Sequence, residues 1–403
     1  MTTAAVPWTE ARSLAYRAGR EAIREPVEVP IADADGLTLA SALTTLTDLP
    51  AFPTSSVDGY AGRGTPPWRL VGRVLAGSVP GPIADGEAVE IATGAMVPDG
   101  TTQILRVEDA TTLEDGRVDG AARAVPDFRD RGDEAAKGED LFPAGVVVTP
   151  GLIGLAAACG YDSLVVTPAV PTAVVVFGDE LLTAGPPGAG RVRDALGPQV
   201  PGWLRRLGAA PIAGLAPRGP VEDTLGAHVE AIQAALDDAD LVCTTGGTMH
   251  GPVDHLHPAL AELGARYIAN TVAVRPGFPM LLAEIPGPRP RFVAGLPGNP
   301  QSAIIALMTL VAPLLAGLTG RPEPALPSVT LADDVPGRGG YTHLALARLD
   351  PTGAASPVAH VGSAMLRGLA GADGFAVIAP ETHGRMGDRV PLLPLPLLPG
   401  GRP

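Results

Sequence analysis

The chain has 403 residues, of which 46% are hydrophobic, and its formal net charge at pH 7 is −14. This length exceeds the usual size of one domain, so we expect about two to four domains with apolar cores. The negative charge argues against nucleic acid or an acidic membrane as a broad electrostatic partner. Two cysteines, Cys159 and Cys243, lie in apolar stretches, which indicates small buried side chains in a reducing compartment rather than a disulfide.

The N-terminal residues lack the apolar core of a signal peptide, and we see no apolar run that approaches the length of a transmembrane helix. We therefore expect a cytoplasmic protein that acts without membrane or nucleic acid.

The first part of the chain is predicted to hold a helix and then a β-rich region. Apolar residues between Leu14 and Ile23 have helical spacing, with Thr9 as the expected N-cap. Short strands broken by glycine and proline follow, between residues 27 and 131. Asp58 and Thr93 each precede a glycine there, so by local sequence alone both are turn residues.

Three apolar strands are predicted in the second part of the chain, and each ends in a polar, glycine-containing loop. These loops contain Gly178-Asp179-Glu180, Gly246-Gly247 and Pro297-Gly298-Asn299-Pro300. Strand, loop and helix in this order are typical of a parallel α/β sheet, in which ligands bind beyond the carboxyl ends of the strands. Paired glycines and helix N-termini suit an anion. We therefore expect a ligand pocket at this edge.

The side chains of these loops allow more than one role. Asp179 and Glu180 suit Mg²⁺ held jointly with a substrate phosphate, but they equally suit the charge at a helix N-terminus. Asp254 either caps the following helix or faces the crevice. Ser302 either caps a helix over about 302–318, which is favoured, or binds ligand.

A histidine metal site is the weaker hypothesis for the second of these loops. His250, His255 and His257 are close in sequence. However, residues two apart on a helix do not face each other, so His255 and His257 are poor co-ligands.

Eight segments, taken together, are more specific than any of these patterns. They are FPTSSVDGYA, IATGAMVPDGT, RGDEAAKGED, VVVFGDEL, ADLVCTTGGTMHGPVD, RPGFP, AGLPGNPQSA and HVGSAMLRGLAGADGFAVI. In order and spacing they resemble the MoeA family of molybdopterin molybdenumtransferases, which includes the C-terminal domain of gephyrin. The resemblance covers nearly the whole chain.

The resemblance implies an elongated multidomain chain of class α/β plus β. Residues 1–26 and 141–170 would form a helical and mixed dimerisation domain I, and 27–140 an inserted β-rich domain II. Residues 171–322 would form domain III, a MogA-like doubly wound α/β domain that binds molybdopterin. Residues 323–403 would form a β-barrel-like domain IV.

The activity that the resemblance implies is Mg²⁺-dependent insertion of molybdate into adenylylated molybdopterin, with release of AMP. It implies a homodimer whose cleft is shared between chains, so that Asp58 reaches into the partner's site. The implied catalytic residues are Asp58, Glu180 and Asp254, and the implied Mg²⁺ ligands are Asp179, Glu180 and Asp254. Substrate contacts are implied for Ser56, Gly59, Tyr60, Thr93, Gly94, Gly178, Asp194, Gly246, Gly247, Arg275, Pro297, Gly298, Asn299, Pro300 and Ser302.

Four positions depart from the family pattern. The usual Lys-Pro-Gly-Lys-Pro reads Arg275 to Pro279 with Phe278 in place of the second lysine, and Phe177, Leu196 and Met249 replace polar or smaller residues in other motifs. Phe278 therefore either leaves an anion site short of a cation or is a core residue. A second function stays open, namely a divergent paralogue that binds a pterin, a nucleotide or a partner protein without inserting metal.

Overall fold

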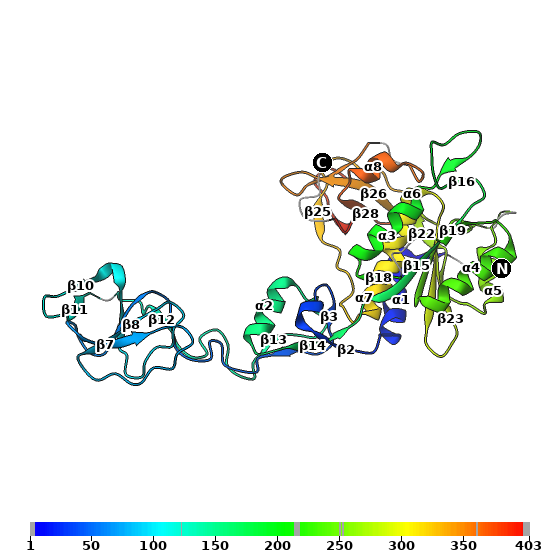
Figure 1. Cartoon of the computed structure of the whole chain (residues 1–403). Coiled ribbons are helices and arrows are strands. Elements are labelled where there is room, and N and C mark those ends of the chain that lie inside the picture. Colours follow the sequence, from blue (N-terminus) through cyan, green and yellow to red (C-terminus); the bar gives the residue numbers. More distant parts are fainter. Residues whose placement is uncertain are drawn as a thin grey trace. The chain divides into compact units, whose positions relative to one another are not determined.

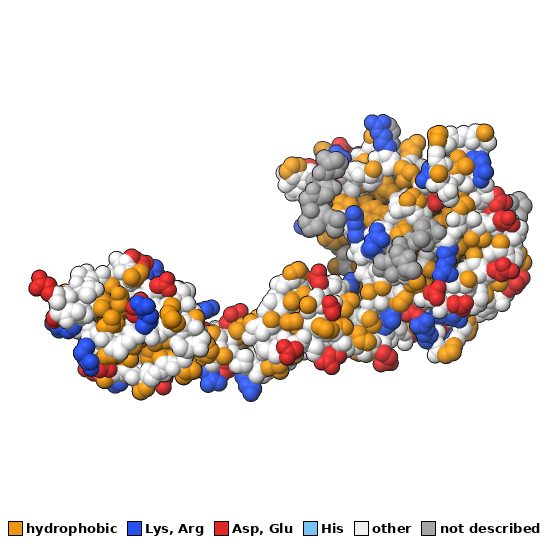
Figure 2. Space-filling model, in the orientation of Figure 1, with side chains coloured by type: hydrophobic (Ala, Val, Ile, Leu, Met, Phe, Trp, Pro, Cys, Tyr) orange, Lys and Arg blue, Asp and Glu red, His pale blue; other side chains and the backbone are white. Residues whose placement is uncertain are grey.

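The computed structural model describes residues 5–121, 123–212, 218–249, 251, 254–359 and 362–397. Internal contacts divide the chain into two compact units. The small unit comprises residues 28–35 and 41–165, and the large unit comprises 1–27, 36–40 and 166–403. The small unit is β-rich and the large unit contains most of the helices (Figure 1). Acidic and basic side chains are interspersed on the visible face of both (Figure 2).

The small unit is built on a four-stranded sheet of order β7-β8-β6-β9. These strands are β6 (Gly59–Gly62), β7 (Arg69–Val74), β8 (Glu87–Ile91) and β9 (Gln103–Arg106). Shorter pairs surround it: β4 (Leu43–Thr44) with β13 (Asp140–Phe142), β5 (Thr54–Ser55) with β12 (Phe128–Arg129), and β10 (Ala110–Thr112) with β11 (Val118–Gly120). The predicted run of short strands is therefore confirmed.

A short helix and a small sheet accompany these strands. Helix α2 (Pro150–Ala158) begins where Thr149 accepts a hydrogen bond from the Leu152 amide, and Cys159 follows its end. Proline at the first helical position and glycine just beyond the end, Pro150 and Gly160, are the usual residues at such helix boundaries. A three-stranded sheet has the order β2 (Val27–Pro30), β14 (Ser163–Thr167), β3 (Thr38–Leu39).

The large unit contains the predicted α/β sheet, with strand order β18-β15-β20-β24-β23-β21 and β19 also paired to β15. The strands are β15 (Val170–Phe177), β18 (Ala209–Pro211), β19 (Arg218–Val221), β20 (Leu241–Thr245), β21 (Arg266–Asn270), β23 (Leu281–Ile285) and β24 (Arg291–Leu296). The three predicted strands β15, β20 and β24 are parallel neighbours, with Val174 opposite Cys243 and Cys243 opposite Ala294. Their polar loops therefore share one edge, as predicted.

Helices cover both faces of this sheet, because alternate strand residues enter two different cores. Val174 and Val176 pack with α1 (Trp8–Glu21), α3 (Leu196–Arg206), α6 (Pro300–Ala306) and α7 (Ala312–Leu318). Val175 and Phe177 pack with α4 (Leu225–Asp238) and α5 (Leu256–Glu262). Apolar residues on both sides of each strand are the expected signature of a doubly wound sheet, and this prediction is confirmed.

The longest apolar helix lies inside this core. Helix α6, a π-helical segment (Leu307–Val311) and α7 form one 19-residue helix, Pro300–Leu318, with a mean hydropathy of 1.9. By length and composition it could span a bilayer, so our expectation that no apolar run approaches that length was wrong. Every residue of its most apolar stretch is buried in the protein, as expected for a core helix surrounded by packed elements.

Helix α1 differs from its prediction at its N-terminus. It starts at Trp8 after Pro7 and has no side-chain cap, so the predicted Thr9 cap was wrong. It packs on α7 in the large unit. A Cβ on Gly19 would lie 2.3 Å from the Leu314 carbonyl oxygen, so glycine permits this close helix contact. The four-domain boundaries stay a prediction.

The C-terminal region forms a second seven-stranded sheet in the order β1-β22-β26-β28-β29-β25, with β27 paired to β26. Its strands are β1 (Val6–Pro7), β22 (Val272–Arg275), β25 (Ser328–Thr330), β26 (Thr342–Leu349), β27 (Ala355–Pro357), β28 (Gly374–Ile378) and β29 (Arg389–Pro394), and α8 (Leu366–Ala370) lies beside them. An isolated bridge pairs Leu331, directly after β25, with Ala355 of β27, and β27 pairs with β26. Strands β26, β28, β29, β25 and β27 therefore follow one another in a closed order, which agrees with the expected barrel-like region. Two further strands, β1 and β22, come from outside residues 323–403.

Candidate functional site

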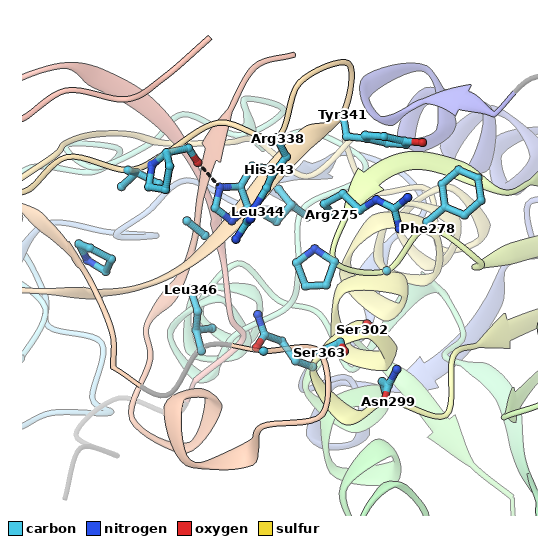
Figure 3. A pocket seen from close by; sticks show the side chains of 18 of the residues that line it. Arg275, Phe278, Asn299, Ser302, Arg338, Tyr341, His343, Leu344, Leu346 and Ser363 are labelled. Carbon is cyan, nitrogen blue, oxygen red and sulfur yellow. Dashed lines mark hydrogen bonds between the residues drawn. The ribbon is translucent and has the colours of Figure 1, made fainter. Parts of the chain in front are cut away.

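A pocket of about 870 Å³ lies in the large unit, where the two sheets meet. Its walls are the loop after β22, the start of α6, and the segment before and within β26 (Figure 3). Strands β22 and β26 are parallel neighbours with Arg275 opposite His343. This pairing brings the end of one predicted motif beside residues that follow it by more than sixty positions in the sequence.

The pocket has an excess of unpaired positive charge. Arg275 and Arg338 both line it, and within the described chain neither side chain has an ion pair or hydrogen bond. The carboxylate that lines the same pocket, Asp334, already has partners: it is 3.2 Å from Arg385 and accepts a 2.8 Å bond from the Met386 amide. The amide bond and then Arg385 hold the pKa of Asp334 below its usual range. An anionic ligand therefore matches the pocket.

The guanidinium of Arg275 lies against two aromatic rings. Its Cζ is 5.0 Å from the centroid of the Phe278 ring and 4.4 Å from that of Tyr341. The two rings are edge to face, with centroids 5.9 Å apart and an angle of 82° between their planes. Figure 3 shows Arg275 between these residues. Phe278 is neither a buried core residue nor an isolated apolar ring: it is half-buried and lines the pocket.

Two further polar groups line the pocket. The Nδ1–H of His343 donates to the Pro336 carbonyl at 2.7 Å, which leaves Nε2 as an acceptor in the neutral ring. Burial, aided by nearby Arg338, lowers the pKa of His343 and favours this neutral form, although the Pro336 bond opposes the shift. The side-chain oxygen of Gln301 is buried and has no hydrogen-bond partner among the described residues. A buried amide oxygen without a partner is costly, so a ligand donor suits this position.

Four of the expected substrate contacts line this pocket: Arg275, Pro297, Asn299 and Ser302. Ser302 lies inside the first turn of α6, which begins at Pro300 after Asn299, and the helix start has no side-chain cap. The favoured interpretation of Ser302 as a cap was therefore wrong, and its alternative role in ligand binding stays a prediction. Gly298 lies outside the pocket wall, and a Cβ on it would be 3.7 Å from the Cα of Gly246.

The expected metal ligands do not line the pocket. Asp179 is exposed at the end of β15, where its Oδ1 accepts from the Asp223 amide at 3.3 Å and Asp223 Oδ2 accepts from the Asp179 amide at 3.2 Å. Glu180 is exposed beside Gly178, whose φ is +136°. A Cβ at Gly178 would be 2.6 Å from Glu180 Oε2, so glycine leaves room for that carboxylate.

Asp254 is used within its own loop. Its Oδ2 accepts a 2.7 Å bond from the Gly251 amide, and α5 begins two residues later without a side-chain cap. The capping alternative for Asp254 was therefore wrong. In the described ranges no three His, Cys, Asp or Glu side chains gather closely enough to hold a metal ion. The residues Asp179, Glu180 and Asp254 thus do not form a metal site by themselves.

The histidines of this region have other neighbours. His250 lies outside the described residues. His257 Nδ1 is 2.8 Å from the Tyr267 hydroxyl. His255 meets the ring of His228 edge to face, with centroids 5.6 Å apart. The metal hypothesis for His250, His255 and His257 therefore has no support among the described residues.

Phe177, one of the four departures, is explained by a buried histidine. The His228 ring is fully buried and stacks on Phe177 with centroids 3.6 Å apart and an angle of 8°. Its Nε2 is 3.5 Å from Asp223 Oδ1. Burial lowers the pKa of His228, while Asp223 opposes the shift. Of the other departures, Leu196 is buried and Met249 is exposed.

The glycine loop after β20 is only partly available as an anion site. The Gly246 amide donates to the Leu296 carbonyl at 2.9 Å, so this amide is already used within the protein. Gly246 and Gly247 have φ values of +89° and +66°, which favour glycine. Asp194 also has a local role: its Oδ1 accepts from the amides of Leu196 and Gly197, both at 2.9 Å, at the start of α3.

In the small unit, pairing of β6 with β8 brings two expected residues together. Asp58 Oδ1 accepts from the Thr93 amide at 2.7 Å and from its hydroxyl at 2.9 Å. The amide bond and then the hydroxyl bond lower the pKa of Asp58, so this exposed carboxylate stays charged. Its place in a partner's site stays a prediction.

The neighbours of Asp58 have mixed roles. Ser56 and Gly94 are exposed, whereas Tyr60 packs beside the buried Trp68. A Cβ on Gly59 would lie 2.2 Å from the Leu105 carbonyl oxygen, so this glycine permits close strand packing. The role of Gly59 as a substrate contact stays a prediction.

Sequence reasoning missed several residues that the fold brings to these sites. Arg338, Tyr341 and His343 carry no local signal, because only the long-range pairing of β22 and β26 brings them to the pocket. Asp223 could have been found, because it follows β19 as Asp179 follows β15. Gln301 lies within the AGLPGNPQSA segment, but nothing in the local sequence marks it as a ligand-binding residue.

Comparisons with known proteins agree with this geometry. Three family profiles match in chain order: MoeA N-terminal region (domain I and II) at residues 6–160, probable molybdopterin binding domain at 173–317, and MoeA C-terminal region (domain IV) at 328–395. Molybdopterin molybdenumtransferase 2 of Mycobacterium tuberculosis is 32% identical over 330 residues, which cover 75% of this chain and 77% of that protein.

Two further relatives extend the comparison. Molybdopterin molybdenumtransferase of Staphylococcus aureus is 28% identical over 335 residues, covering 79% of this chain and 78% of the relative. The crystal structure of a molybdopterin biosynthesis MoeA protein from Pyrococcus horikoshii matches with a TM-score of 0.78 and 26% identity, covering 98% of this chain and 100% of that one. Over nearly its whole length, then, this chain belongs to the MoeA family of molybdenum cofactor biosynthesis.

Proposed function

We propose that the protein inserts molybdate into adenylylated molybdopterin and releases AMP, as a molybdopterin molybdenumtransferase. The observation that carries this proposal is the pocket between the two sheets, which contains two arginines, Arg275 and Arg338, without hydrogen-bond or ion-pair partners in the described part of the chain. Molybdate is a dianion, and charge-assisted hydrogen bonds from arginine are the strong kind. The names of the relatives supply the substrate class.

The residues of the pocket would divide the work between charge and orientation. Arg275 and Arg338 would bind the oxyanion. The Ser302 hydroxyl and the unpartnered Gln301 oxygen would fix polar atoms of the ligand, since each lines the pocket at the buried start of α6. Neutral His343 adds an acceptor, not a charge, at physiological pH.

The proposal includes a requirement for Mg²⁺, although the carboxylates that would bind the ion do not form a preassembled site. Asp179 and Glu180 are exposed carboxylates at the end of β15, and no cluster of metal ligands exists among the described residues. Mg²⁺ would therefore bind there only with oxygens of the substrate phosphates, which is common for this ion. When bound, it would neutralise charge that develops on the cleaved phosphoanhydride.

The active form would be a cytoplasmic homodimer. Asp58 is exposed, and two hydrogen bonds from Thr93 to its Oδ1 hold the orientation of its carboxylate. An oriented, exposed carboxylate suits a role in the cleft of a second copy of the chain. Light scattering at micromolar concentration should therefore give twice the mass of the chain.

The deciding experiment is complementation of a bacterial strain that lacks its own molybdenumtransferase. The wild-type chain should restore molybdoenzyme activity, and Arg275→Gln should not. Glu180→Ala and Asp254→Ala should fold normally and lose most activity. Normal complementation by Arg275→Gln would refute the pocket assignment.

The alternative, a paralogue that binds without inserting metal, predicts a different pair of results. Such a protein would fail to complement while still binding molybdopterin or AMP in a calorimetric titration. The feature that favours it is that the described residues contain no group of side chains arranged to hold a metal ion.

A further inference from the structure

We propose that Phe278 and Tyr341 are positioning residues that orient the guanidinium of Arg275 for binding the substrate oxyanion. This inference rests on the proposed function, because it assumes that an oxyanion enters the pocket. The inference gives a role to the ring of Phe278, which occupies a position where the family pattern has lysine.

The geometry places Arg275 within cation–π distance of both rings. The 5.0 Å and 4.4 Å distances from its Cζ to the ring centroids lie inside the usual limit of about 6 Å. The rings contact each other edge to face, which is a favourable aromatic arrangement. The three side chains therefore form one cluster, which we call the Arg275 clamp.

The aromatic rings of the Arg275 clamp carry no net charge, unlike a carboxylate, which is the usual partner of an arginine. A carboxylate would also fix the guanidinium, but it would cancel its charge and occupy its N–H donors. Phe278 and Tyr341 carry no net charge, and the Arg275 side chain keeps all its donors without an acceptor in the described chain. The clamp thus restricts the rotamers of a flexible side chain while its full positive charge faces the pocket.

The backbone around each ring supports this role. The Phe278 carbonyl accepts a 3.1 Å bond from the Val272 amide, so the loop is tied back to β22. Gly277 has a φ of +105°, and a Cβ there would come within 3.1 Å of Ile305 and of Met280. Tyr341 lies in a tight turn, where its amide donates to the Arg338 carbonyl at 3.4 Å. These backbone contacts hold the two segments that carry the rings.

A rival explanation is that the rings contact the ligand themselves, for example by stacking on a pterin. The two explanations differ when Arg275 is absent. Positioning residues lose their effect on anion binding once Arg275 is replaced, whereas direct contacts keep theirs.

The test is calorimetric titration with sodium molybdate at low ionic strength, with a melting curve for each variant. Phe278→Leu and Tyr341→Leu remove a ring, and Phe278→Tyr and Tyr341→Phe are matched controls that keep it. Each ring loss should raise the Kd for molybdate about two- to fivefold, which corresponds to one exposed cation–π contact. The ring-retaining variants should bind like wild type.

A second control removes a ring elsewhere. Tyr267 is half-exposed on β21, where its hydroxyl meets His257, and it is not in the pocket wall. Tyr267→Leu should leave the Kd for molybdate unchanged. In the Arg275→Gln background, adding Phe278→Leu should produce no further loss of binding.

The outcomes separate this inference from the proposed function. If wild type binds no molybdate, both fail. If Arg275→Gln abolishes binding but the ring-loss variants bind like wild type, the anion site stands and the clamp is refuted. A further loss on adding Phe278→Leu to Arg275→Gln would also refute it, because the ring would then contact the ligand directly.

Discussion

Phe278 removes one positive charge from the pocket, but its ring contacts the positive charge that remains on Arg275. Lysine at this position would add a cation, while the phenyl ring instead contacts the cation already present on Arg275. The two alternatives expected from the sequence, a missing cation or a core residue, therefore omitted a third. The ring lines the pocket and is only half-buried.

The first prediction concerns Phe278→Lys. The new ammonium should strengthen molybdate binding, but loss of the ring should weaken the orientation of Arg275, so the net gain should be only about threefold. Binding should also become more sensitive to salt, because more of it is Coulombic. Calorimetry at two salt concentrations measures both. Unchanged affinity with a lower melting temperature would mean that Phe278 serves packing instead.

The second prediction concerns His228, which is fully buried against Phe177. Burial lowers its folded-state pKa below the ordinary value of 6.5, opposed by Asp223 and Asp179 and aided by His255. At a pH below 6.5 the unfolded chain binds a proton at His228 that the folded chain excludes. The free energy of unfolding therefore decreases as the pH is lowered from 6.5 to the folded-state pKa. Above pH 6.5, His228 is neutral in both states and contributes no pH dependence to the stability.

His228→Leu should therefore lose less melting temperature than wild type between pH 7.5 and pH 5.5. The control is His383→Gln, which changes an exposed histidine and should follow wild type. Equal losses for wild type and His228→Leu would show that the other acid-sensitive groups dominate.

Site residues could be predicted from the sequence only where they lie within a short sequence motif. Arg275 and Ser302 lie in motifs, and the pocket contains both. Arg338 and His343 enter it through strand pairing over long sequence distance. The burial of His228 depends on the packing of α4 on the sheet, which no spacing of apolar residues reveals for a polar side chain.

At the scale of elements, the parallel strands β15, β20 and β24 were predictable because strand, glycine loop and helix follow one another locally. The association of α1 with α7 was not. It depends on two glycines, Gly19 and Gly317, that lie on helices almost 300 positions apart. Glycine in a helix is normally unfavourable, so only the structure explains these two.

The third prediction follows from that contact. A Cβ on Gly317 would lie 2.4 Å from the Tyr16 carbonyl oxygen and 2.7 Å from the Arg20 amide nitrogen. Gly317→Ala should therefore force the helices apart and cost about 1–3 kcal/mol, as overpacking does. A thermal melt should show a midpoint lowered by several degrees.

The chain supplies a matched control in α3. A Cβ on Gly202 meets no atom within 4 Å, so Gly202→Ala should leave the melting temperature unchanged or raise it slightly, by roughly 0.5–1 kcal/mol of stability. Similar destabilisation by both substitutions would mean that helix contact is not the cause.

At the scale of the whole molecule, the proposed function divides its essential residues between the two units of one chain. Asp58 is in the small unit, and Glu180 and Asp254 are in the large unit. A cleft shared by two chains would combine Asp58 of one copy with Glu180 of the other. A mixed dimer of two inactive variants can then contain one intact site.

The fourth prediction uses this arrangement. Asp58→Ala and Glu180→Ala should each be inactive as homodimers, and mixing them under conditions that exchange subunits should restore about a quarter of wild-type activity, since half the dimers are mixed and each has one intact site. Mixing either variant with itself should restore none. A mixture that stays inactive although subunits exchange would place both residues in the cleft of a single chain, and the shared site would be wrong.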